Sequence, residues 1–101
     1  MIYKFRSKAA GDVIMLGPNG DQMLRLIGRD PAAKGIIEPP AMPTAVAALE
    51  AAIAADEAAR AEAQADDDRP ADSVALRPRM WPMIEMLKRA HRADEPVVWG
   101  V

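Results

Sequence analysis

The organisation of this chain is decided by residues 41–71, which read AMPTAVAALEAAIAADEAARAEAQADDDRPA. Large apolar residues in the first part of this stretch recur at helical spacing and share one helix face, at Met42, Val46, Leu49 and Ile53. Pro43 suits the first turn of that helix, where a proline removes no donor that the helix needs. The pattern predicts a long helix that begins near Pro43 and packs by one face.

The rest of the stretch has little to bury. Large apolar residues stop after Ile53, although alanine keeps the helix propensity high. Residues 50–72 carry two bases and eight acids, a charge of −6, whereas residues 1–49 and 73–101 carry +2 each. Blocks of like charge usually stay solvated. We therefore expect residues 54–72 to form a projecting helix end and a flexible acidic linker.

Short strands are predicted near both ends of the chain. Ile2–Arg6 alternates, with Tyr3 and Phe5 pointing to one side. Val97–Trp99 is a closing strand and Gly35–Glu38 a further short strand, which ends at the following prolines. The apolar run Asp12–Leu16 fits either a strand or a helical turn.

A turn followed by a helix is predicted at Gly17–Gly20. Proline presets the backbone of a turn and glycine tolerates a positive φ. Asn19 fits the N-cap of a helix and Gln22, three residues on, completes a capping-box pattern. The predicted helix runs from about Gly20 to Ile27, and Gly28 supplies its C-terminal stop.

A last helix is predicted within residues 76–92, where apolar residues follow helical spacing. Pro78 and Pro82 complicate this segment, because a proline inside a helix costs about 3 kcal/mol unless it lies in the first turn. We expect an irregular start, with regular helix from about Trp81 or Pro82 to Arg92.

These elements predict a small α+β fold in which residues 1–101 form a single domain. Three helices would pack on a short sheet of two or three strands formed with the chain termini. With 101 residues the core is small, and self-association is a natural way to bury more surface. There is no cysteine, which excludes a disulfide or a thiolate metal site. No apolar run approaches the ~20 residues that span a bilayer, so a cytoplasmic location without membrane contact is expected.

Both ends of the chain carry a resemblance to a known family. The opening Tyr3–Val13, YKFRSKAAGDV, and the closing Trp81–Leu87, WPMIEML, followed by Val97–Trp99, resemble the domain-of-unknown-function family numbered 1840. Gly17–Gly20 departs from the form of many members, in which the helix follows the first glycine directly. The resemblance covers essentially the whole chain. It implies a proteobacterial source and supplies no catalytic or binding residue.

A candidate interaction surface lies on the last predicted helix, at Met80, Trp81, Met83, Met86 and His91. Methionine adapts to irregular partners, and tryptophan is a common anchor of interfaces. Most of the methionines are nevertheless expected simply to belong to the core, and the interface is the lesser of the two interpretations. His91 is the single histidine of the chain, and no acid is spaced so as to select it for catalysis or metal binding.

A candidate anion contact is formed by the basic residues near the two ends, Lys4, Arg6, Lys8, Arg77 and Arg79. The Gly17–Gly20 turn before a helix N-terminus is a second one, although Asp21 places a negative charge there. Nucleic acid is not the expected partner, because its binding favours a denser basic patch with aromatic residues for stacking.

The sequence therefore favours a non-enzymatic protein-interaction or self-associating module, with a homodimer or another protein as partner. The alternative is a binder of a small anionic ligand or of nucleic acid. No nucleophile with a base is visible, so we expect no enzymatic activity and no cofactor.

Overall fold

The computed structural model describes residues 2–66 and 75–100. Its elements are β1 (Ile2–Ser7), β2 (Ala10–Leu16), α1 (Gly17–Leu26), β3 (Gly35–Ile37), the short 3-10 helix η1 (Pro39–Ala41), α2 (Met42–Asp66), α3 (Leu76–Ala93) and β4 (Val97–Trp99). The α+β class is confirmed. Residues 67–72 of the predicted acidic linker lie outside the described residues.

The sheet has four strands in the order β2-β1-β4-β3, and every neighbouring pair is antiparallel. The expected two or three strands become four because the ambiguous run Asp12–Leu16 belongs to strand β2. Its residues pair with β1 in the register Ile2↔Leu16 and Phe5↔Val13. Terminal strands β1 and β4 are neighbours, as the sequence predicted, and they pair at Arg6↔Val98.

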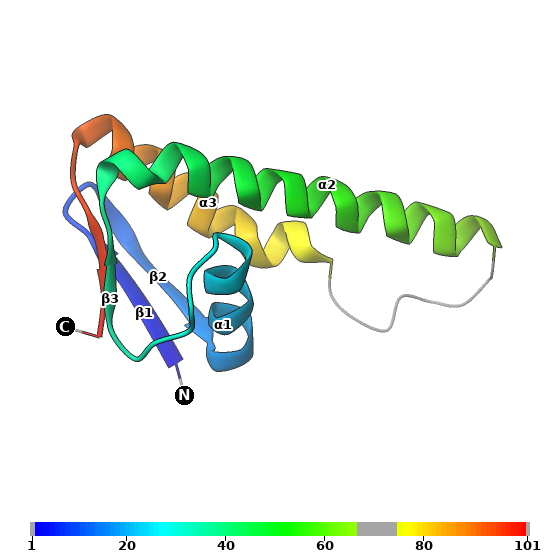
Figure 1. Ribbon diagram of the computed structural model, residues 1–101, viewed down its shortest axis with the longest axis horizontal. Coiled ribbons are helices and arrows are strands. Elements are labelled where there is room, and N and C mark those ends of the chain that lie inside the picture. The colour runs from blue at the N-terminus through cyan, green and yellow to red at the C-terminus, as the bar shows by residue number, and fades with distance from the viewer. Residues whose placement is uncertain (1, 67–74, 101) are drawn as a thin grey trace.

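The three helices lie on one side of the sheet, and α2 runs antiparallel to α3 along it (Figure 1). One face of every strand therefore supplies the core: Tyr3 and Phe5 of β1 are 2% and 0% exposed. The Phe5 ring contacts Trp99 of β4 at a centroid distance of 5.4 Å. The other core residues come from β2, β3, β4 and the helices, among them Met15, Met23, Leu24, Ile37, Met42, Leu49, Ile53, Ile84, Leu87 and Val97.

Helix α1 begins at Gly17, so the predicted turn and capping box at Gly17–Gly20 are wrong. Leu16 occupies the N-cap without a side-chain hydrogen bond, and Pro18 lies in the first turn. The helix can begin so early because Gly17 and Gly20 are buried and Gly20 packs directly on the ring of Tyr3. The predicted stop at Gly28 is confirmed: its φ is +85°, and its N–H donates to the carbonyl of Arg25 at 3.0 Å.

Helix α3 is regular from Leu76, so the expected irregular start is also wrong. Pro78 falls in the first turn, where a proline removes no intrahelical bond. Pro82 lies inside the helix and removes one bond. The helix persists because it buries apolar side chains on both sides of Pro82, from Leu76 and Met80 to Met83 and Ile84.

Helix α2 begins at Met42, one residue before the predicted start, and buries Met42, Leu49 and Ile53 as its pattern indicated. It continues past Ile53 to Asp66 and extends beyond the start of α3 (Figure 1). Asp56 and Glu57 still contact α3, through Leu76 and Arg77.

Candidate functional site

The predicted methionine surface on α3 is buried. Met80 and Met83 are 0% exposed and Met86 is 2% exposed, all within the core of the chain itself. The expectation that most of these methionines belong to the core is therefore confirmed, and their possible role in an interaction surface is corrected. The physical reason is that α3 lies between α2 and the sheet and presents its methionine-bearing side to the core, where flexible thioethers fill irregular space.

Two residues of that predicted surface remain exposed, Trp81 and His91. The indole ring of Trp81 lies between two cations of its own helix. The Arg77 guanidinium is 5.6 Å and the Lys88 ammonium 5.7 Å from the ring centroid. These contacts within the chain give the Trp81 ring two partners at the surface, where the residue is 39% exposed.

The basic residues near the two ends do not gather at one site. Arg77 forms two hydrogen bonds of 2.9 Å with the carboxylate of Glu57, and this pairing raises the pKa of Arg77. Arg79 donates to the side-chain oxygens of Asn19 and Gln22 at 3.2 and 2.8 Å. The two residues predicted to form a capping box thus hold an arginine of α3 instead.

The remaining three bases lie at strand β1 and its turn. Lys4 pairs with Asp12 of β2 at 3.5 Å, and Arg6 lies 4.0 Å from the same carboxylate. Lys8 belongs to the β1–β2 turn and lies apart from Arg77 and Arg79, which belong to the start of α3. The expected convergence of the two ends at one anion site is therefore not found.

The open face of the sheet is the surface that sequence reasoning missed. Ile2, Ile14 and Leu16 are each 64% exposed, and Ile36 is 40% exposed. Ile2 lies directly opposite Leu16, and Ile14 is two residues from Leu16 on the same side of β2. We call Ile2, Ile14 and Leu16 the apolar patch. The alternating pattern of β1 predicts that Ile2 lies on the side of the sheet opposite Tyr3 and Phe5. Ile14 and Leu16 could not be assigned to a side, because their segment fits either a strand or a helical turn.

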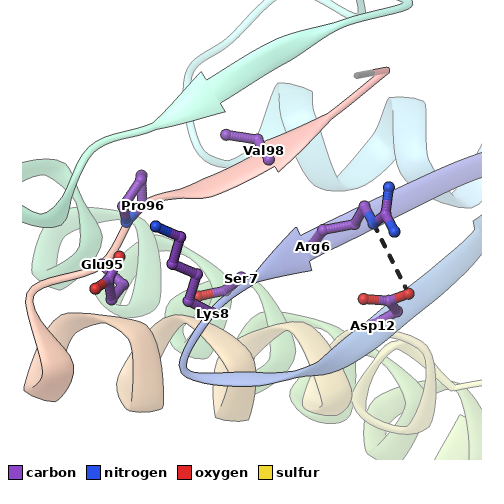
Figure 2. Close-up of a pocket in the computed structure, with 7 residues that line it drawn as sticks. All are labelled: Arg6, Ser7, Lys8, Asp12, Glu95, Pro96 and Val98. Carbon is purple, nitrogen blue, oxygen red and sulfur yellow. Dashed lines mark ion pairs between the residues drawn. The ribbon is translucent and has the colours of Figure 1, made fainter.

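A cavity of about 660 Å³ lies toward the other end of β1. Its walls come from β1, the β1–β2 turn, β2 and the α3–β4 connection, through Arg6, Ser7, Lys8, Asp12, Glu95, Pro96 and Val98 (Figure 2). The cavity forms where strands β1 and β4, which pair at Arg6↔Val98, are no longer paired. Arg6 is four residues from Ile2 on β1, and Asp12 is two residues from Ile14 on β2. Because side chains alternate along a strand, the cavity and the apolar patch share the open side of the sheet.

Neither a metal-binding cluster nor a membrane-spanning helix is present among the described residues. Residues 2–66 and 75–100 hold no group of three or more histidine, cysteine or acidic side chains arranged to bind a metal ion. No helix within the described part of the chain has the length and apolar character needed to cross a membrane.

Fold and surface together define a small α+β protein whose antiparallel sheet is covered by helices on one side and open on the other. The sequence model of the family described as Domain of unknown function (DUF1840) matches residues 1–99. The chain belongs to this family, which confirms the resemblance carried by its two ends. No curated protein and no solved structure matches the chain.

Proposed function

We propose that this protein is a non-enzymatic module that associates with a second copy of itself through the open face of its sheet. The observation that carries the proposal is the apolar patch, with three large aliphatic side chains that are each 64% exposed on adjacent strands. Single exposed aliphatic residues are common, whereas contiguous exposed patches usually mark an interaction site.

Charge on the same face favours a second copy as the partner. Lys4 and Asp12 both belong to the open face and carry opposite signs. A twofold axis places the same surface of two copies together, with each residue i against residue j of the partner. An axis that runs along the strands between β1 and β2 lets the two apolar patches meet, with Ile2 of one copy against Leu16 of the other and Lys4 against Ile14. In this twofold-symmetric contact, neither Lys4 nor Asp12 faces a residue of the same charge.

The size of the face sets the strength that we expect. Strand β1 has six residues, which at about 3.3 Å each give a length of about 20 Å. Four strands about 4.8 Å apart give a width of about 19 Å. Because β3 and β4 have only three residues each, the footprint is about 300 Å², less than half of the ~800 Å² per partner of a standard interface. The dimer should therefore be weak and dependent on concentration.

Sedimentation velocity from about 10 μM to about 1 mM tests this proposal. The test variant is Ile14→Glu, because residue 14 lies opposite Lys4 and the new carboxylate gains a cross-strand partner within the monomer. The matched control is Ala58→Glu, which places the same charge on an exposed position of α2.

We expect dimer formation by the wild type and by Ala58→Glu, and monomers for Ile14→Glu. A wild type that stays monomeric at the highest concentration overturns the proposal, and so does a dimer that Ile14→Glu does not weaken. The bacterial source, the cytoplasmic location and the lack of catalytic activity remain predictions beside it.

A further inference from the structure

The cavity beside Arg6 has the size and position of a ligand site that is separate from the apolar patch. Its volume of about 660 Å³ falls within the roughly 300–1,000 Å³ typical of small-molecule pockets. The patch is centred on Ile2 and Leu16, at the start of β1, whereas the cavity begins at Arg6, near the end of that strand. Asp12 lines the cavity and also belongs to the face proposed for self-association, so a ligand at this end of the face and a second copy of the chain would compete for it.

The charges that line the cavity fall into two kinds. Asp12 is neutralised by two bases, because Lys4 lies 3.5 Å and Arg6 4.0 Å from its carboxylate. Lys8 and Glu95 differ from Asp12. Among the described residues, neither of them forms an ion pair. Lys8 comes from the β1–β2 turn and Glu95 from the α3–β4 connection. Figure 2 shows the Lys8 side chain extended toward Pro96 and Glu95, so the two opposite charges line the same end of the cavity.

The rest of the lining is apolar or able to hydrogen-bond. Pro96 and Val98 provide apolar surface beside Glu95. The hydroxyl oxygen of Ser7 accepts a hydrogen bond from the backbone N–H of Ala9 at 3.2 Å, which leaves its own proton to donate. An apolar wall with a few convergent polar groups is the usual composition of a small-molecule site.

We propose that this cavity binds a small zwitterion, a free amino acid or a short peptide. Its ammonium group faces Glu95, its carboxylate faces Lys8 and its apolar part covers Pro96 and Val98. A simple anion fits less well, because the unpaired carboxylate of Glu95 lines the same cavity and repels it. The proposal stands independently of self-association.

Titration of the ¹⁵N-labelled full chain, followed by NMR, tests the ligand class. Four probes at up to about 20 mM separate the contributions of the two charges: leucine and leucyl-leucine carry both, N-acetylleucine lacks the ammonium charge and leucinamide lacks the carboxylate charge. We expect leucine, leucyl-leucine or both to shift the amide signals around Ser7 and Val98, with the preferred probe showing whether an amino acid or a peptide is the source. Removal of either charge should weaken binding at least about threefold. Absence of binding by leucine and leucyl-leucine overturns the proposal, as does equally strong binding of a blocked probe.

Variants test the two charges on the protein side. Lys8→Met and Glu95→Gln should each weaken binding of the preferred probe at least about threefold. Lys34→Met and Glu50→Gln are matched controls at exposed positions outside the cavity and should leave it unchanged. Equal loss in test and control variants contradicts the assigned contacts. The same titration on Ile14→Glu separates the two proposals, because this monomeric variant keeps every residue of the cavity and should bind the ligand at least as tightly as the wild type.

Discussion

The carboxylate of Asp56 in α2 accepts a hydrogen bond of 3.0 Å from the backbone N–H of Leu76, the first residue of α3. Ala75, at the N-cap of α3, has no side-chain acceptor to offer. The cap of α3 is therefore supplied by another helix, 20 residues earlier in the chain. Arg60 holds the same carboxylate with its Nε at 2.9 Å. This one residue joins the two long helices at the point where α3 begins.

Loss of this cap should lower the stability of the whole domain. We expect Asp56→Ala to lower Tm by about 4–8 °C, the size typical for removal of a helix cap from a domain of this length. Asp56→Asn keeps an acceptor and should lower Tm less. Thermal unfolding followed by circular dichroism measures both. Glu50→Ala, at an exposed position of the same helix, is the control, and an equal loss there would contradict a capping role.

The same contact predicts a dependence on acid. The hydrogen bond from Leu76, followed by the bond and charge of Arg60, lowers the pKa of Asp56 below its ordinary 3.8. A lowered pKa in the folded state means that the ionised group stabilises the fold above pH 3.8, and that this contribution disappears as the pH falls through the folded value. The difference in Tm between wild type and Asp56→Asn should therefore shrink below pH 3.8. A difference that stays constant down to pH 2 would show that the charge is not responsible.

A close approach explains glycine at position 20. A Cβ atom there would overlap the ring of Tyr3, which lies in the core. Overpacking costs about 1–3 kcal/mol, and alanine returns up to about 1 kcal/mol through its helix propensity. We expect Gly20→Ala to destabilise the protein by about 1–2 kcal/mol in urea unfolding. Gly11→Ala is the control, because a Cβ at that position has no neighbour within 4 Å. Similar effects of the two substitutions would contradict the contact with Tyr3.

The burial of the α3 methionines can be separated from an interface role. Met83 is 0% exposed, so Met83→Ala should cost about 2–5 kcal/mol of unfolding free energy at any protein concentration. His91 is exposed at the end of the same helix, and His91→Ala should change the stability by less than about 0.5 kcal/mol. If Met83→Ala left the stability intact and weakened only self-association, the core assignment would be wrong.

Tyr3 should make the fold sensitive to alkali. Its hydroxyl donates to the carboxylate of Asp21, and this bond, together with burial and the charge of Asp21, raises the pKa of Tyr3 above 10.0. A raised folded pKa stabilises the protein below pH 10.0, and that stabilisation is lost as the pH rises through the folded value. Ultraviolet absorbance of the single tyrosine should show ionisation above pH 10, and Tyr3→Phe should lose less stability than the wild type there. Ionisation at the ordinary pH would contradict the bond.

The sequence predicted the fold where one periodic pattern had one interpretation. The alternation of Ile2–Arg6, the helical spacing from Met42 to Ile53 and the stop at Gly28 all have local causes, and the structure confirms them. Prediction of secondary structure failed where a segment fitted two local structures equally well, because contacts with residues distant in the sequence decide which structure forms. Residues 12–16 become a strand because β1 pairs with them, a contact that is visible only in three dimensions.

The same reason explains the errors in the candidate site. Asn19 and Gln22 have the spacing of a capping box, yet they bind Arg79 from a helix about 60 residues away. The α3 methionines fit a groove or a core, and the position of α3 between α2 and the sheet decides for the core. The apolar patch depends on the pairing of β1 with β2 and on a face of the sheet that no helix covers, so a local pattern in the sequence could indicate Ile2 but not the whole patch.

The contacts between α2 and α3 also limit how much of the acidic segment the fold requires. Asp56 and Glu57 make polar contacts with the start of α3, and Arg60 holds the carboxylate of Asp56; all three precede residue 61. We expect replacement of residues 61–71 by a short Gly/Ser linker to change the unfolding free energy by less than about 1 kcal/mol, because the cost of closing a loop varies slowly with its length. Urea unfolding of the two chains measures this, and Asp56→Ala in the shortened chain should cost as much as in the full chain. A shortened chain that no longer unfolds cooperatively would show that the acidic segment is part of the fold.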